Sequence, residues 1–299
     1  MKTREVSFLR SIGSGLCMGS ADAVPGVSGG TIALVVGIYD DFINALSVMI
    51  KSPKLLTSKD GRAKIAKALK LLVPLGMGIL AGYILIVKLL VGKEHAPGIL
   101  LRYNSAHICF GFLFGLVLAS IPEPMRRIKS ISFPHWLMFA AAAAISAWFV
   151  GLPHMHSAPE KWMLLIGGAG AISVMLLPGI SGSLLLVILG QYAAIGQAVT
   201  GRDWPILLTV AAGIAMGIIT FVPLLRWLLS KAEAQTMAIL AGLMTGSLRA
   251  LWPFKQYYNP KEGMLANTLE IRDLHWVILA AVAGILTIFV LRRIDMRSH

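Results

Sequence analysis

The sequence predicts an all-α polytopic membrane protein with two inverted-topology repeats, each a re-entrant helical hairpin followed by three transmembrane helices. Three observations lead to this fold class: long apolar segments, two apolar segments that Pro-Gly interrupts, and a motif that occurs twice. Hydrophobic residues make up 57% of the 299 residues and charged residues only 14%. Because a soluble domain carries about 25% charged residues, most of this chain is expected to face lipid or other apolar helices.

The first predicted element is a re-entrant hairpin over residues 8–50. It is interrupted at Pro25-Gly26, and the apolar run that begins at Thr31 ends at Asp40. At about 1.5 Å per residue, such a short run covers only about half of the hydrocarbon thickness. The segment is therefore expected to enter and leave the membrane on the same side.

Three spanning helices are expected after this hairpin, and the same order follows in the second half. A crossing needs about 20 apolar residues. In the first repeat, residues 1–153, the predicted spans are 71–91, 105–121 and 134–151. In the second repeat, residues 154–299, the hairpin covers 160–200 and the spans are 205–225, 235–252 and 275–291.

One motif marks the turn of both hairpins. Pro25-Gly26-Val27-Ser28-Gly29-Gly30 returns 153 positions later as Pro178-Gly179-Ile180-Ser181-Gly182-Ser183. Later glycines repeat too, since Gly111 and Gly115 have the spacing of Gly242 and Gly246. Three spans are an odd number, so the second copy is expected to be inserted upside down. Inverted repeats with broken helices are typical of secondary transporters.

The basic residues indicate the orientation in the membrane. Eighteen of the 27 lysines and arginines lie on the predicted inner side and seven on the predicted outer side. This asymmetry predicts a multi-pass protein of the bacterial cytoplasmic (inner) membrane with both termini in the cytoplasm. The net charge of +13 does not predict a nucleic-acid partner, because the basic residues lie in short segments between apolar runs.

The two Pro-Gly-x-Ser-Gly turns are the predicted binding site for an anionic group. Backbone N–H groups at a helix start point toward a ligand, glycine allows close approach, and hydroxyls add donors. The predicted phosphate ligands are Gly26, Ser28, Gly29, Gly30, Thr31, Gly179, Ser181, Gly182, Ser183 and Arg249. The alternative is that the turn residues only cap helices and form the hairpin bends.

Asp22 and Arg249 are charges within predicted membrane segments. A carboxylate at such depth is costly unless it is paired, hydrated or protonated. Asp22 is therefore predicted to carry a coupling proton, to pair with Arg249, or to cap a helix at a water-filled vestibule. Arg249 suits bidentate phosphate binding; the alternative is that its side chain extends to the outer interface near Trp252. Met175 replaces Asp22 in the second repeat.

No cofactor and no metal site are predicted. Cys17 and Cys109 both lie within apolar stretches, and their spacing fits neither a disulfide framework nor a metal site. Packing as small buried side chains is the expected role of both.

The chain resembles the PopT family of polyprenyl-phosphate transporters in two motifs, Ala21 to Thr31 and Leu177 to Ser183. It also resembles that family in the Gly-x-Tyr sequence that ends each apolar run, Gly37 to Tyr39 and Gly190 to Tyr192. The resemblance covers nearly the whole chain. It implies a transporter that returns undecaprenyl phosphate, the lipid carrier of cell-envelope synthesis, from the outer to the inner leaflet of the cytoplasmic membrane. The transport could be coupled to protons that Asp22 carries, and the sequence leaves this coupling open.

Two other functions remain as alternatives. Intramembrane undecaprenyl-pyrophosphate phosphatases also resemble inverted repeats with Pro-Gly-x-Ser turns, but their chemistry needs an acidic cluster for metal and base. Gly29 and Gly182 follow the serines here, where a phosphatase would be expected to have an arginine. We therefore expect no enzyme and no catalytic residue. The second alternative is a transporter of small anions.

Overall fold

The computed structural model describes residues 7–23, 27–93, 96–97, 105–152, 159–256 and 267–297. Within these residues five helices are long and apolar enough to cross a membrane, or up to seven if each of two bent helix pairs counts as one span. The strands of this part of the chain are β1 (Gly92–Lys93) and β2 (Ala96–Pro97), a short antiparallel pair. The prediction of an all-α polytopic membrane protein is confirmed.

The helices follow the order that the sequence predicts. The first half contains α1 (Phe8–Asp22), α2 (Gly29–Val35), α3 (Tyr39–Ile50), α4 (Ser52–Leu55), α5 (Lys59–Ile86) with a π-helical end at Val87–Val91, α6 (Ala106–Ser120), α7 (Pro122–Arg126) and α8 (Phe133–Val150). The second half contains α9 (Lys161–Met175), α10 (Gly182–Ile188), α11 (Tyr192–Gly201), α12 (Trp204–Lys231), α13 (Glu233–Ser247) and α14 (Leu274–Arg297).

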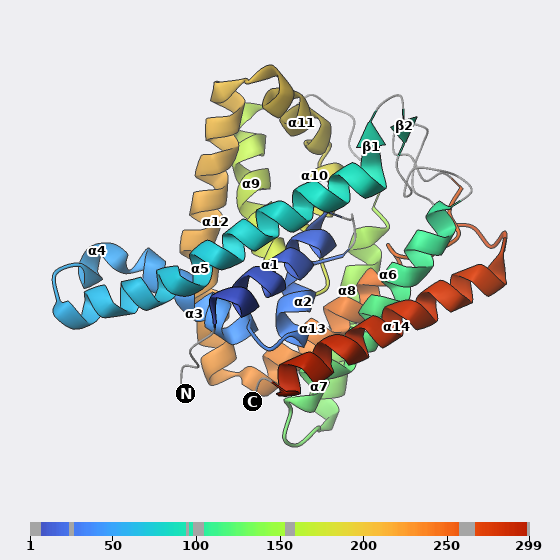
Figure 1. Ribbon diagram of the computed structural model, residues 1–299, viewed down its shortest axis with the longest axis horizontal. Coiled ribbons are helices and arrows are strands. Elements are labelled where there is room, and N and C mark those ends of the chain that lie inside the picture. Colours follow the sequence, from blue (N-terminus) through green and yellow to red (C-terminus); the bar gives the residue numbers. More distant parts are fainter. Residues whose placement is uncertain are drawn as a thin grey trace.

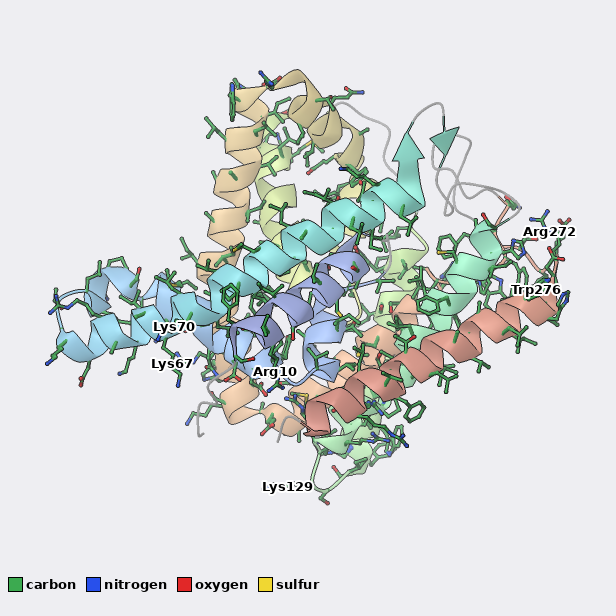
Figure 2. The ribbon with its side chains drawn as sticks, in the orientation of Figure 1. Arg10, Lys67, Lys70, Lys129, Arg272 and Trp276 are labelled. Atoms are coloured by element: carbon green, nitrogen blue, oxygen red, sulfur yellow. The ribbon has the colours of Figure 1, made fainter. Side chains whose placement is uncertain are left out.

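The two longest helices begin at polar caps. The Ser58 hydroxyl accepts a hydrogen bond from the backbone N–H of Gly61 at the start of α5, and the Asp203 carboxylate accepts one from Ile206 at the start of α12. These caps satisfy backbone donors that have no partner within the helix. α5 begins 12 residues before the predicted span because its lysine-rich first turns also favour a helix. These turns project from the bundle with α4, and Figure 2 shows Lys67 and Lys70 there.

α13 is shorter than a full membrane crossing: its 15 residues begin two positions before the predicted span 235–252 and end at Ser247. Its side chains are buried on several sides, including those of Met237, Leu240 and Met244. A helix that packs against protein on most sides can be short, because it need not match the lipid thickness.

Glycines set the close helix pairs of the bundle. A Cβ atom on Gly15 of α1 would clash with α5, and one on Gly213 of α12 would clash with α9. In the same way Gly115 of α6 lies against α14, and Gly246 of α13 lies against α8. Small residues allow this approach of membrane helices. The last two spans of each half thus pair with those of the other half, and Figure 1 shows α6 beside α14.

The core lies around α2, a helix of seven residues that are all buried. Figure 1 shows α2 at the centre of the molecule, and α1 begins and α14 ends on the same side of it. An isolated helix of this length has little stability in water. α2 is therefore held by its surroundings, and these surroundings include the turn of the second hairpin.

Candidate functional site

Both predicted hairpins contain a bent helix pair of the same form. α2 and α3 make an angle of 118°, and α10 and α11 make an angle of 105°. The bends lie at Gly37, with φ 70°, and at Gly190, with φ 69°. Glycine adopts such positive φ values without the steric cost that a side chain brings. The Gly-x-Tyr repeat of the sequence therefore marks a repeated backbone bend.

The two hairpin turns are in direct contact. The Ser28 hydroxyl donates a hydrogen bond to the carbonyl oxygen of Leu177 over 3.2 Å. The backbone N–H of Gly179 donates one to the Thr31 hydroxyl over 3.0 Å. Ser28, Thr31 and Ser181 are 2%, or less, exposed. Residues about 150 positions apart in the sequence therefore form one buried polar centre.

Gly179 fits its place for two independent reasons. Its φ of 100° is a backbone conformation that side chains disfavour. A Cβ atom on it would lie 2.5 Å from the backbone nitrogen of Met244. The second turn is thus fixed against the backbone of α13.

The first turn is closed by an acid. The backbone N–H of Gly29 donates a hydrogen bond to the Asp22 carboxylate over 2.7 Å, and that of Gly30 donates to the Ser28 hydroxyl over 3.1 Å. Asp22 is the last residue of α1, on the other arm of the hairpin. Two amides predicted to bind phosphate are therefore already hydrogen-bonded in this conformation.

The start of α10 differs from that of α2. No side chain caps it, and the hydroxyl oxygens of Ser181 and Ser183 lie 2.7 Å apart. Met175 takes the place of Asp22, since its Cβ is 3.2 Å from where a Cβ on Gly182 would lie. The two turns thus have matched positions but different chemistry.

Arg249 lies apart from both turns. Its guanidinium donates a hydrogen bond to the carbonyl oxygen of Ala147 over 2.8 Å, and a Cβ on Gly151 would clash with it. Ala147 belongs to the last turn of α8, where carbonyl groups lack helical partners. Asp22 and Arg249 form no ion pair with each other. Of the other predicted ligands, Gly26 lies outside the described residues.

Comparison with known proteins places this geometry in a family. The family model described as undecaprenyl phosphate translocase-like matches residues 18–268, which include both turns. The chain belongs to this translocase-like family.

Two curated relatives support the same assignment. A polyprenyl-phosphate transporter of Vibrio cholerae is 34% identical over 258 residues, which cover 86% of this chain and 81% of the relative. A polyprenyl-phosphate transporter of Staphylococcus aureus is 28% identical over 260 residues, or 80% of this chain and 84% of the relative. No solved structure matches the chain. The resemblance to this transporter family that the motifs indicated is thereby confirmed.

Sequence reasoning missed the role of Tyr39 in this translocase-like chain. Its side chain is fully buried, and its hydroxyl donates a hydrogen bond to the carbonyl oxygen of Leu176 over 2.9 Å. Tyr39 thus connects the start of α3, at the bend of the first hairpin, to the turn of the second. The repeat of Gly-x-Tyr at Tyr192 was the signal that could have drawn attention to it.

Basic side chains tie several helices together at the end of the bundle where α14 finishes. Arg127 contacts the Asp40 carboxylate at 2.7 Å, and Arg292 contacts the Glu123 carboxylate at 2.9 Å. Arg226 donates a hydrogen bond to the Ser47 hydroxyl over 3.0 Å. Figure 2 shows Lys129 at this end, and Arg272 and Trp276 at the far end of α14.

Proposed function

We propose that this chain carries undecaprenyl phosphate across the cytoplasmic membrane, from the outer to the inner leaflet. The structural observation that carries the proposal is the contact of two Gly/Ser turns in the buried centre of a membrane bundle. The curated relatives are named polyprenyl-phosphate transporters, which supplies the substrate class. The phosphate head passes through the protein while the isoprenoid tail remains in lipid.

The proposed phosphate site uses the donors of both turns. The proposed donors are the hydroxyls of Ser28, Ser181 and Ser183 and the backbone N–H groups of Gly29 and Gly179. Several of these donors now serve protein acceptors: the Asp22 carboxylate, the Leu177 carbonyl and the Thr31 hydroxyl. Phosphate oxygens can replace these acceptors without leaving a donor unsatisfied, which limits the cost of the exchange. Gly26, Gly30, Thr31 and Gly182 complete the proposed turns.

Asp22 sets the proposed charge balance of the site. A phosphate and a carboxylate repel each other at close range, and a proton on the acid removes this repulsion. Uptake of a proton by Asp22 when the head arrives would therefore couple transport to protons. The position of Asp22 against the amide of Gly29 supports this role, because that amide is one that the head would take over.

The proposed cycle moves one half of the chain against the other. Residues 1–153 and 154–299 are the two proposed inverted repeats, with both termini in the cytoplasm. Rocking of such halves exposes a central site to each side in turn. Matched glycine contacts at Gly15 and Gly168, with α5 and α12 respectively, support a repeated architecture.

The test is a leaflet-resolved assay of labelled undecaprenyl phosphate in liposomes that contain the purified chain. The wild type should move the lipid, and Ser28→Ala together with Ser181→Ala should slow the movement more than tenfold. Thr220→Ala is the matched control, because its exposed hydroxyl bonds only to the preceding turn of its own helix. Equal rates for the double variant and the control would refute the proposed site.

Two direct measurements distinguish the proposed function from its two rivals. Release of phosphate from undecaprenyl pyrophosphate by the purified chain would support the phosphatase instead. Among the described residues, no three His, Cys, Asp or Glu side chains gather at a common point. Flux of inorganic phosphate through liposomes without lipid substrate would support the small-anion transporter.

A further inference from the structure

Lys255 is a buried cation that the proposed cycle leaves unused. It is 5% exposed, although the sequence places it in a loop after a span. Its ammonium nitrogen donates a hydrogen bond to the Asn267 side-chain oxygen over 2.9 Å and lies 5.1 Å from the centre of the Phe110 ring. Within the described part of the chain, no carboxylate pairs with it.

Such a cation needs an anion. Buried charges in proteins are normally paired with an opposite charge or bind a ligand. An ammonium has three N–H donors, and the amide of Asn267 uses one of them. A ring face adds a weaker attraction. Burial lowers the pKa of Lys255 to about 8, so the side chain remains mostly charged at neutral pH.

The protein holds Lys255 in place by a network of hydrogen bonds. Lys255 and Asn267 form an antiparallel backbone bridge, and the Asn267 side chain also donates to the carbonyl oxygen of Arg249 over 2.9 Å. The backbone carbonyl oxygen of Thr268 accepts a hydrogen bond from the Trp252 indole N–H over 3.1 Å. A lysine on an ordinary loop would extend its head into water. Here the bridge keeps the head under the surface.

The surroundings suit a phosphate that carries an apolar chain. Trp252 packs edge-on against Phe114 at 6.3 Å and against Phe254 at 6.1 Å between ring centres. Asn267, whose side-chain oxygen accepts the hydrogen bond from the ammonium, is itself exposed. The site therefore combines one cation, one amide and an aromatic wall.

Its location links it to the hairpin turns. Met244 of α13 contacts Gly179, and the chain continues from there through Arg249 to Lys255. Phe110 lies one turn after the start of α6, at the end of the bundle where α14 begins. In Figure 2 this end of the bundle carries the labels Arg272 and Trp276.

We propose that Lys255, Asn267 and Phe110 form a second anion site, which takes the phosphate head of a polyprenyl phosphate before the head reaches the hairpin turns. The identity of the ligand rests on the proposed function. The recognised chemistry is a phosphate monoester, from a lipid head or from free phosphate. Binding at Lys255 places the head on the route along α13 to Gly179.

Two substitutions of Lys255 in the full chain test this site. Lys255→Gln should raise the substrate concentration at half-maximal transport by roughly tenfold, the loss expected for one charge-assisted hydrogen bond. The maximal rate should change little, and Lys255→Arg should retain most of the affinity. Lys161→Gln, which removes an exposed cation at the start of α9, is the matched control. An unchanged half-maximal concentration for Lys255→Gln would overturn the proposal.

A third variant separates binding from a purely structural role. Asn267→Asp supplies a carboxylate at the position of the present amide, so it should raise the melting temperature and also raise the half-maximal substrate concentration. A structural role for Lys255 predicts the first change without the second, which would also overturn the proposal.

Melting temperatures of the purified protein in detergent, measured with and without ligand, identify the source of the phosphate. They also distinguish a failure of this site from a failure of the proposed function. At the same concentration, undecaprenyl phosphate should raise the melting temperature of the wild type more than that of Lys255→Gln, and undecaprenol should raise neither. Inorganic phosphate that reproduces the shift assigns the site to free phosphate. A shift without any lipid movement in liposomes would leave the anion site standing and remove the transport function. Equal shifts of the melting temperature for the wild type and Lys255→Gln would refute the proposed site.

Discussion

The Asp22 carboxylate accepts a hydrogen bond from the backbone N–H of Gly29, at 2.7 Å. This contact ties the end of α1 to the start of α2 across the turn of the first hairpin. The acid stands where the first amide of α2 would otherwise meet an anionic ligand. In the second hairpin Met175 takes the corresponding place beside Gly182, so the two turns are chemically unequal.

Removal of this acceptor should destabilise the first turn. Asp22→Ala leaves the Gly29 amide unsatisfied, and we expect a loss of about 1–3 kcal/mol in the free energy of unfolding. Asp22→Asn keeps an oxygen acceptor, so its loss should be smaller, while any proton dependence of transport should vanish. Unfolding in detergent and transport at several pH values measure both effects. Met175→Leu is the matched control, and a loss there as large as for Asp22→Ala would contradict the assignment.

Gly179 should tolerate no side chain. Gly179→Ala combines a φ of 100° with a contact of 2.5 Å to the Met244 nitrogen, and strain of this kind costs about 1–3 kcal/mol before the clash is counted. We expect a marked fall in melting temperature and in transport. Gly196→Ala in α11 is the control, because nothing lies within 4 Å of its added Cβ. That variant should match the wild type or be more stable.

Tyr39 should contribute through its hydroxyl alone. Tyr39→Phe removes the hydrogen bond to the Leu176 carbonyl and leaves that oxygen buried, which should cost about 1–3 kcal/mol of stability. Chemical unfolding of the purified chain measures this loss. The same change at half-exposed Tyr192, its repeat counterpart, should cost less. A larger loss at Tyr192 would contradict the role assigned to Tyr39.

Lys255 should give the fold a specific pH dependence. Burial lowers its pKa from 10.5 to about 8. Between these values the unfolded chain holds more protons than the folded chain, so stability should rise as the pH rises from 8 to 10.5. Below pH 8 the full cost of the buried charge is present. The difference in melting temperature between wild type and Lys255→Gln, followed against pH, should change in this window. A flat difference would contradict the burial of the charge.

The helix pattern could be predicted from the sequence because apolar length and glycine spacing decide it. Each predicted span overlaps a helix, and the contact of Ser28 with Leu177 brings together the two turns that the sequence assigned to one site. The early start of α5 was not predicted, because a hydropathy criterion stops at the lysines that helix propensity tolerates.

The orientations of the Arg249 and Lys255 side chains could not be predicted from the sequence. Arg249 turns to the last carbonyls of α8, a helix about 100 residues away in the chain, and only the packing of α8 against α13 brings that acceptor near. Lys255 follows a span and has the pattern of a loop lysine, yet its backbone bridge to Asn267 draws it inward. Contacts between distant segments determine both orientations, and the spacing of residues in the sequence does not reveal such contacts.

The exchange of partners between the halves affects how the protein is made. α6 pairs with α14 and α8 pairs with α13, so the glycine face of α6 at Gly111 and Gly115 has no partner until α14 has been made. Assembly of the bundle therefore waits for helices of the second half. A chain that stops early leaves unmatched helices in the bilayer, a form that membrane proteases can recognise.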